Sequence, residues 1–351
     1  SWQQQHTTMA LLKDAPFKIF RDCGQSEFLR SLKRALPKGS TSWYSFYSSV
    51  HGGIVTDPHL MCVPMDDHMC HRGHAVFDTC NIHNGNAYGL DMHMDRLFLS
   101  AQKARIPPRF SKEEAKTVVL HTLAATGKKD DIFCRYWLSA GRGDFSVSPK
   151  NCEGGSHFHV IVHAFKNKDF LKDGTEEWVT DNIPAKPPLL ATMKSTNYLI
   201  NALVAMESED KGGMLGLQVD HRGRLLESAI ANVAIVDKEG RFRTPAFDEI
   251  LAGTTVRRAL ALGDALRRRG LLTGLEVGAV TLGDALRARE MIGFGGGGAW
   301  PVRRLNGRPV GGGRPGPVFG ALRALLAADL ENPEFLDPIP YHLYQQDYQE
   351  K

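Results

Sequence analysis

Residues 216–245 read GLQVDHRGRLLESAIANVAIVDKEGRFRTP, and this stretch is the most informative about the fold. The runs LGLQVD and ANVAIVD are short and apolar, which predicts two strands. The polar HRGR between them predicts a turn. Two strands followed by segments with helical spacing indicate an α/β domain.

Downstream of this stretch, predicted strands and helices alternate. A helix is expected from Thr254 to Arg269, then strands in EVGAVTL and AREMIGF, and a last helix at about 318–330. The sequence therefore predicts a larger α/β domain over residues 176–340, followed by a C-terminal tail at 341–351.

The N-terminal half has a different texture. Strand-like runs follow Trp43: WYSFYSSV, GGIV, LMCVPM and HAVFDTCNI, with RYWLS and HFHVIVHAF further along. Helices are expected at about 92–105 and 111–126, where Ser111 is a suitable N-cap with acidic residues in the first turn. Residues 41–165 therefore predict a smaller, mixed α+β domain.

Two further segments complete the expected organisation. Residues 1–40 are predicted to form a helical N-terminal extension, with the helix at about 11–36, because FLRSLKRAL places apolar residues at helical spacing. Residues 166–175 are polar and lack clean periodicity, so they are expected to be the linker between the domains.

The bulk properties exclude several classes of protein. The chain has 351 residues, of which 42% are hydrophobic and 23% charged, as expected for a soluble protein of two domains. A net charge of +4 is too small to indicate nucleic-acid binding. The six cysteines are sparse and form no CxxC pair, which favours reduced thiols. No apolar run reaches the ~18 residues of a membrane span.

Lys194 and Glu227 are the first candidates for chemistry. Lys194, in ATMKSTNYL, follows an apolar and proline-rich approach, and an amine in such surroundings can serve as a nucleophile. Glu227, in GRLLESAIANVAIV, lies where a polar turn meets an apolar strand, and its carboxylate could pair with a protonated ring nitrogen. Taken alone, each is more often an ordinary surface residue.

Three other elements could bind a phosphate. Thr254 and Thr255 open a helix, where backbone N–H groups are free, although an ordinary N-cap is the commoner interpretation. Gly295 and Gly296 begin a run of four glycines that would let backbone donors approach an anion, or would simply form a flexible turn. Arg96, in HMDRLFLSA, could clamp a phosphate or form a surface salt bridge.

The order and wording of these elements are far more specific than each one alone. RGHAVFDT-x-NIHNGNAYGLDMHMDRLFLSAQKARIP (72–107) resembles class IV aminotransferases, in which an "NG" strand pair leads to a helix with "HxxRLxxSA". Residues 194–245 resemble the family's lysine segment and its "xExxxxN" glutamate strand. ILAGTTVRRAL (250–260) and IGFGGGGAWPV-x-x-LNGRPVGGGRPGPV (292–318) resemble its phosphate turn and final segment.

The resemblance implies a fold-type IV pyridoxal 5'-phosphate enzyme of the α/β (α+β) class, with the cofactor between a smaller N-terminal and a larger C-terminal domain. It implies that Lys194 holds the cofactor as a Schiff base and acts as the catalytic acid and base. Glu227 would pair with the pyridine nitrogen, and Tyr198 would face the cofactor. The phosphate would be held by Arg96, Thr255 and the backbone at Gly295 and Gly296, with Thr254 beside it.

Three departures from the bacterial members concern substrate recognition. His74 and Asp78 replace an aspartate and a glutamate. The "TRG" turn, whose arginine helps to bind the substrate carboxylate, reads Ser139-Ala140-Gly141 here. Arg142 lies just beyond this turn and is the candidate substitute. The residues expected to contact the substrate are Phe77, Arg142 and His74.

SSVHGGIV, VPMDDHMCHRGHAVFDT, RYWLSAG and KPPLLATMKSTNYL are worded as in the plant and algal plastid subgroup described as D-amino-acid transaminase or aminodeoxychorismate lyase. The resemblance implies transamination from a D-amino acid such as D-alanine to a 2-oxo acid. The alternative is a lyase that releases pyruvate and 4-aminobenzoate for folate synthesis. It also implies a homodimer located in a plastid, with no nucleic-acid or membrane partner. A catalytically dead binding protein is the alternative from another class, and the intact Lys194 and Glu227 argue against it.

A cluster of histidines and cysteines is a candidate metal site. His68, Cys70, His71, His74, Cys80 and His83 lie in one short stretch. Their spacing lacks the repeated pairs typical of zinc motifs, so no metal is expected.

Overall fold

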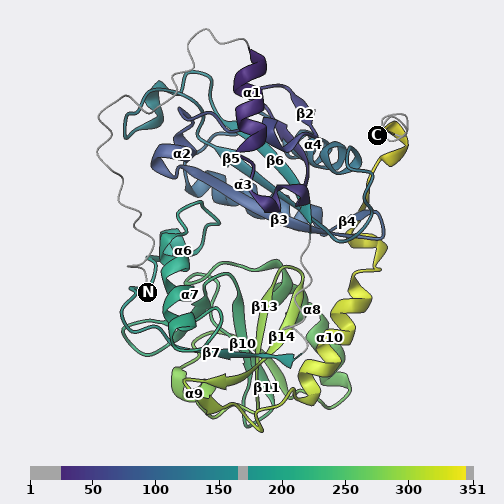
Figure 1. The fold of residues 1–351 in the computed structure, drawn as a ribbon. Helices are drawn as coiled ribbons and strands as arrows, with labels where there is room; N and C mark the ends of the chain where they lie inside the picture. The colour runs from purple at the N-terminus through teal and green to yellow at the C-terminus, as the bar shows by residue number, and fades with distance from the viewer. Residues whose placement is uncertain (1–24, 165–172, 345–351) are drawn as a thin grey trace.

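The computed structural model describes residues 25–164 and 173–344, which form two large sheets, a separate two-stranded sheet, and helices (Figure 1). The first is a seven-stranded sheet in the order β16-β4-β3-β5-β6-β1-β2. Among the described residues, all its strand pairings are antiparallel, which allows alternate side chains to face a core. Its strands are β1 (Trp43–Ser48), β2 (Gly53–Val55), β3 (Ala75–His83), β4 (Asn86–Tyr88), β5 (Ile132–Ser139), β6 (His157–Ala164) and β16 (Leu336–Pro338).

Two helices pack against this sheet and complete its core. Helix α3 (Leu90–Lys103) contributes Met94 and Leu97, and helix α4 (Lys112–Ala124) contributes Val119, to one apolar cluster with the sheet. Helix α4 begins at Ser111, whose hydroxyl accepts the N–H of Glu114 while the Glu114 carboxylate accepts the N–H of Ser111. This reciprocal capping confirms the N-cap expected from the sequence.

The second sheet has the order β12-β11-β10-β13-β14-β15, and β7 pairs with β14. Strands β8 and β9 form a separate two-stranded sheet. The strands are β7 (Thr175–Glu177), β8 (Leu217–Val219), β9 (Leu225–Ser228), β10 (Asn232–Val236), β11 (Arg241–Thr244), β12 (Gly274–Val277), β13 (Glu290–Gly295), β14 (Gly298–Leu305) and β15 (Arg308–Pro309).

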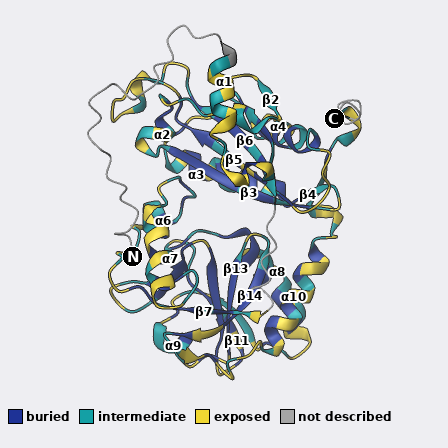
Figure 2. Ribbon diagram, viewed as in Figure 1, coloured by how far each residue is buried: buried dark blue, intermediate teal, exposed yellow. Residues whose placement is uncertain are grey.

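Helices α8 and α10 cover one face of the second sheet, where Val256, Leu322 and Phe294 meet in one apolar cluster. Figure 2 shows strands β10, β13 and β14 buried, whereas the outer faces of the helices are exposed. The helices in this half are α6 (Pro188–Ala191), α7 (Leu199–Asp210), α8 (Thr254–Arg268), α9 (Leu282–Leu286) and α10 (Pro317–Asp329).

The remaining helical segments are short. Helix α1 (Gln25–Arg34) agrees with the part of the N-terminal helix expected at 28–36, and the part expected at 11–24 lies outside the described residues. The others are α2 (His68–Arg72), η1 (Lys38–Ser42), η2 (Pro58–Leu60), η3 (Pro149–Asn151), η4 (Pro333–Phe335) and η5 (Tyr341–Tyr344).

The end of the chain returns to the first sheet. Strand β16 pairs antiparallel with β4, with Asp337 opposite Ala87. Ile339 then lies in the core of that sheet. The segment 336–339, which was expected to belong to the larger domain, therefore packs with the first sheet instead. Figure 1 shows α10 rising beside the second sheet before the chain reaches β4.

One expected strand is absent. LMCVPM at 60–65 contains no strand: η2 ends at Leu60, and the N–H of Cys62 bonds back to the carbonyl of Leu60. Pro64 has no N–H to give to a sheet, which opposes strand formation there. The prediction of a strand from this apolar run is therefore wrong.

Within the described residues, no helix is both long enough and apolar enough to cross a bilayer.

Candidate functional site

The backbone of Lys194 is fixed by the first sheet and by α3. Its N–H donates to the Ser100 hydroxyl (3.1 Å), and its carbonyl accepts the N–H of Phe77 on β3 (2.9 Å). The next residue, Ser195, forms a β-bridge with Val76. Lys194 thus extends the edge of a buried sheet, which holds its side chain in one place.

The amine of Lys194 lies between two aromatic side chains. Nζ is 3.1 Å from the hydroxyl of Tyr198 and 4.7 Å from the centre of the Phe77 ring. The two rings meet edge to face with their centres 5.1 Å apart. Tyr198 is the N-cap residue of α7, so the start of that helix positions its side chain. The structure therefore brings together Lys194, Tyr198 and Phe77, three of the residues singled out from the sequence.

Glu227 lies on β9 and is 7% exposed. Its Oε1 is 3.1 Å from Nζ of Lys186. Its Oε2 accepts the backbone N–H of Leu251 (3.3 Å) and the side-chain amide of Asn232 (3.4 Å). Lys186 Nζ also lies 5.9 Å from the centre of the Tyr198 ring, so this lysine links the glutamate to the Lys194 cluster.

Arg96 forms a buried ion pair, not the surface salt bridge considered from the sequence. Its Nε and Nη2 donate to the two oxygens of Asp78 at 2.8 and 2.7 Å, and His93 Nδ1 is 2.9 Å from the same carboxylate. Burial opposes ionisation of Asp78, but Arg96 and His93 outweigh it and hold the pKa of this carboxyl well below its usual range. Among the described residues, Nη1 of Arg96 has no hydrogen-bond partner.

The start of α8 is open to an anion. No side chain caps its first turn, and Gly253 holds the N-cap position. The N–H groups of such a turn are free donors in the positive field of the helix. Thr254 and Thr255 are 8% exposed and line a small cavity. The cavity is also lined by Asn81, Tyr88, Met92, His93, Arg258, Gly297 and Leu326.

The glycine run forms a tight turn against this cavity. Gly295 pairs with Gly298 across the β13–β14 hairpin, and Gly296 and Gly297 between them have φ values of +57° and +77°. Two successive residues with positive φ make the two-residue turn preferred in hairpins. The Asn81 side chain on β3 donates to the carbonyl of Gly296 (2.7 Å), which fixes the turn against the first sheet.

Asn232 connects the two ends of the site. Besides Glu227, its amide donates to the carbonyl of Leu251 (2.9 Å), just before α8. A Cβ on Gly253 would lie 1.8 Å from Oδ1 of Asn232, so only glycine fits there. The carboxylate of Glu227 and the open turn of α8 are thus packed together through one amide.

Two predicted residues lie outside this cluster. Nε2 of His74 is 2.8 Å from the carbonyl of Ala104, and its Nδ1 is 3.2 Å from Nδ1 of His68. Arg142 is paired through two bonds (2.8 and 2.9 Å) with Asp66. The part of the chain that the structure describes holds no group of three or more His, Cys, Asp or Glu arranged for a metal ion.

Three residues of the site were not singled out from the sequence. Ser100 is the serine of the motif "HxxRLxxSA", and Asn232 is the last letter of "xExxxxN", so the motifs contained both. Lys186 opens the run KPPLLATMKSTNYL, but nothing in that run indicates a contact with Glu227, 41 positions away.

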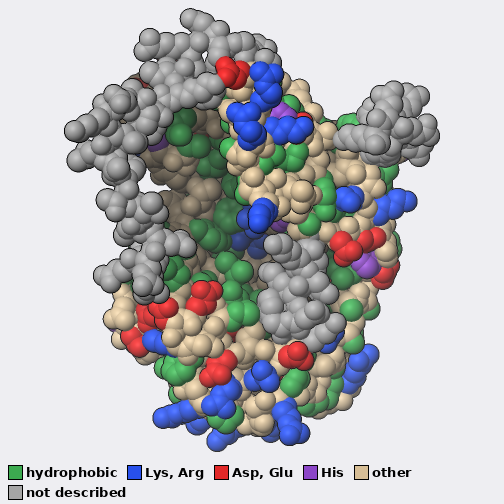
Figure 3. Space-filling model, in the orientation of Figure 1, with side chains coloured by type: hydrophobic (Ala, Val, Ile, Leu, Met, Phe, Trp, Pro, Cys, Tyr) green, Lys and Arg blue, Asp and Glu red, His purple; other side chains and the backbone are tan. Residues whose placement is uncertain are grey.

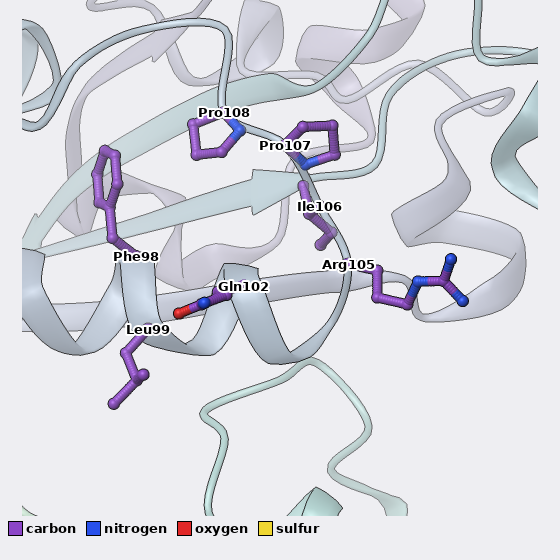
Figure 4. A pocket seen from close by; sticks show the side chains of 7 residues that line it. All are labelled: Phe98, Leu99, Gln102, Arg105, Ile106, Pro107 and Pro108. Atoms are coloured by element: carbon purple, nitrogen blue, oxygen red, sulfur yellow. The ribbon is translucent and has the colours of Figure 1, made fainter.

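Volume alone does not mark this site. A hollow of about 650 Å³ lies along α3 and the segment after it, and Figure 4 shows its mostly apolar lining. Its residues are Phe98, Leu99, Gln102, Arg105, Ile106, Pro107 and Pro108, none of which bears on the chemistry above. A space-filling view shows a recess with hydrophobic side chains on its walls (Figure 3).

Comparison with known proteins places the chain in a family. The model of the class IV amino-transferases matches residues 75–305, and the chain belongs to that family. It is 40% identical over 310 residues to the chloroplastic D-amino-acid transaminase of Arabidopsis thaliana, covering 87% of this chain and 82% of that protein. It is 25% identical over 262 residues to the D-alanine aminotransferase of Bacillus licheniformis, covering 73% and 87%.

Solved structures confirm the expected fold. The branched-chain amino acid aminotransferase of Thermobaculum terrenum, in its PLP form, superimposes with a TM-score of 0.74 at 19% identity, over 85% of this chain and 99% of that one. The branched-chain aminotransferase of Thermoproteus uzoniensis also gives 0.74, at 21% identity and with the same coverage. The fold is therefore that of the fold-type IV aminotransferases, as the sequence predicted.

Proposed function

We propose that this protein is a pyridoxal-phosphate-dependent D-amino-acid transaminase, which moves an amino group from a D-amino acid such as D-alanine to a 2-oxo acid. The observation that carries the proposal is the amine of Lys194, held 3.1 Å from the Tyr198 hydroxyl and beside the Phe77 ring. The 40% identity to a D-amino-acid transaminase over most of the chain supports the substrate class.

The residues present fit pyridoxal phosphate. The uncapped first turn of α8 and the tight turn at Gly296 and Gly297 offer backbone donors, with Arg96 as a nearby cation. Glu227 offers a buried carboxylate for a protonated ring nitrogen, and Lys194 offers the amine for covalent attachment. These groups would hold the phosphate, the ring nitrogen and the aldehyde carbon, respectively.

When bound, pyridoxal phosphate supplies an electron sink for the bond that breaks at the substrate α-carbon. The chain supplies the rest. Lys194, once its amine is free, moves a proton to and from that carbon, and the Tyr198 hydroxyl orients the amine. Glu227 places its carboxylate beside the protonated ring nitrogen. Phe77 forms an apolar wall beside the amine and limits its access to water.

The test is an absorbance spectrum of the purified protein with pyridoxal phosphate, followed on adding D-alanine and a 2-oxo acid, with L-alanine as the control. We expect a visible band from the covalently held cofactor. D-alanine should remove this band and release pyruvate, whereas L-alanine should leave the band unchanged. Absence of the band would refute the cofactor assignment. Equal turnover of L-alanine would refute the substrate class.

A second candidate function, the lyase, follows from the turn that was expected to bind the substrate carboxylate. The turn Ser139-Ala140-Gly141 has no arginine, and the Arg142 side chain is bonded to Asp66. If D-alanine leaves the visible band unchanged, the lyase becomes the better assignment. Aminodeoxychorismate should then yield pyruvate and 4-aminobenzoate, and loss of that reaction in Lys194→Ala would assign it to the same site.

We also propose that the protein is a homodimer located in a plastid. The family resemblance supports the dimer, and the chloroplastic relative supports the compartment. Light scattering of the purified protein tests the first, since a monomer mass would contradict it. Imaging of the tagged full-length protein tests the second.

A further inference from the structure

Glu227 and Lys186 form an ion pair inside the site. Their atoms are 3.1 Å apart, and each side chain is 10% exposed. The other groups on the Glu227 carboxylate, the Leu251 N–H and the Asn232 amide, are neutral. Within the described part of the chain, Lys186 is the only cation bonded to this carboxylate. A buried carboxylate that loses its cation is strongly destabilised.

Lys186 is built into the segment that carries Lys194. Pro187 and Pro188 follow it directly, and α6 then leads to Lys194. The prolines restrict the backbone, whereas the four-carbon stem of a lysine leaves its amine free to swing. The Tyr198 ring, 5.9 Å from Nζ, offers an aromatic face beside the present position of the amine.

The carboxylate of Glu227 is thus already neutralised by the chain itself. The proposed function requires the same carboxylate to pair with a protonated ring nitrogen, and one carboxylate cannot give its full interaction to two cations. Resting on that function, we propose that Lys186 is an internal counter-ion that holds the Glu227 carboxylate in place in the cofactor-free protein, and that the ring nitrogen displaces it when the cofactor binds.

Lys186 is a positioning residue in this scheme, because it acts through Glu227. It has two opposite effects. It stabilises the cofactor-free protein, since it compensates a buried charge. It also weakens cofactor binding, since the pair must open first. A lysine with a merely structural role would produce the first effect and not the second.

The first experiment measures the pair without cofactor. The melting temperature of the cofactor-free protein is compared for wild type, Lys186→Met, Glu227→Gln and the double variant. We expect each single variant to melt several degrees lower and the double variant to recover part of the loss, because it leaves no unpaired charge. Losses that simply add would overturn the pairing.

The second experiment titrates the same cofactor-free proteins with pyridoxal phosphate and follows the fluorescence. We expect Lys186→Met to bind about 5- to 150-fold more tightly, the usual range for coupled sites. Lys186→Arg keeps the cation and should stay near wild type. The control is Lys211→Met, which removes a lysine paired with Glu207 on the surface and should change nothing.

The outcomes separate the two proposals. Equal or weaker binding by Lys186→Met, with wild type binding normally, overturns the displacement of Lys186 and leaves the transaminase assignment standing. A wild-type protein that binds no pyridoxal phosphate refutes the proposed function, and the displacement with it. If Lys186→Met does not fold, Lys186→Gln is titrated instead, with the same expectation.

Discussion

Two buried carboxylates show how single residues in this site manage charge. Asp78 is bound by Arg96 through two bonds and by His93, all close to its own position in the chain. Glu227 depends on Lys186, from a distant segment. Asp78 and its two partners are therefore part of a rigid framework. The pairing of Glu227 depends instead on the side chain of Lys186, whose long stem is able to move.

Replacing Lys194 tests the centre of the site. Lys194→Ala should lower transamination at least about 10³-fold, because both covalent attachment and proton transfer depend on this amine. Borohydride reduction with pyridoxal phosphate should label a peptide containing Lys194 in wild type and leave the variant unlabelled. Lys211→Ala is the control and should be labelled at Lys194 as wild type is. Full activity in Lys194→Ala would contradict the assignment.

Asp78 gives a prediction for acid stability. Its folded-state pKa is lowered, so its ionisation stabilises the protein above the unfolded-state pKa of about 3.9, and this contribution is lost as pH falls below that value towards the folded pKa. Asp78→Asn leaves Arg96 unpaired and should cost about 3–5 kcal/mol at pH 7. The difference from wild type should be constant above about pH 5 and shrink below about 3.9. Melting curves against pH measure this, and a difference that grows in acid would contradict it.

At the scale of single elements, the β13–β14 hairpin is defined by its glycines. Both turn residues have positive φ, a backbone conformation that residues other than glycine adopt at a cost. Their surroundings differ. A Cβ on Gly296 would meet nothing within 4 Å, whereas one on Gly297 would lie 1.9 Å from Nδ2 of Asn81.

The two glycines therefore make a matched pair of variants. Gly296→Ala should destabilise the protein by about 1–2 kcal/mol through backbone strain alone. Gly297→Ala should cost a further 1–3 kcal/mol or so, because the new methyl group displaces Asn81. Denaturant unfolding of both variants measures the difference. Equal losses would show that Asn81 yields freely and does not fix the turn.

At the scale of the whole molecule, one buried acid joins elements of both sheets. Asp329, at the end of α10, is bonded to Arg258 of α8 through two bonds (2.8 and 2.6 Å). It also accepts the hydroxyl of Tyr88 on β4. Burial and Asp329 together raise the pKa of Tyr88, so this hydroxyl stays a donor. The first sheet is thereby held to the helices of the second.

Arg258→Met should weaken this junction. It leaves the buried Asp329 without its cation and should cost about 3 kcal/mol, the lower end for a buried pair because Arg258 is partly exposed. Arg287→Met removes a single bond (3.2 Å) to Asp284 at the surface and should cost less than about 1 kcal/mol. The free energy of unfolding of both variants is the measurement. Equal costs would show that Asp329 contributes little to the junction.

The sequence by itself determined the family and the fold class, and it singled out Lys194, Tyr198, Phe77 and Glu227 as candidates. Local patterns sufficed there, because capping, turns and apolar periodicity depend on neighbours a few residues apart. The N-cap at Ser111 and the strand HAVFDTCNI are examples.

Only the tertiary structure decided which distant groups meet. It paired Lys186 with Glu227, placed β16 in the first sheet, and bonded Arg142 to Asp66 and His74 to the carbonyl of Ala104. Each depends on how segments far apart in the chain pack together, which no local pattern encodes. A lysine in a proline-rich run looks the same in the sequence whether it faces water or a buried carboxylate, and the fold alone supplies that partner.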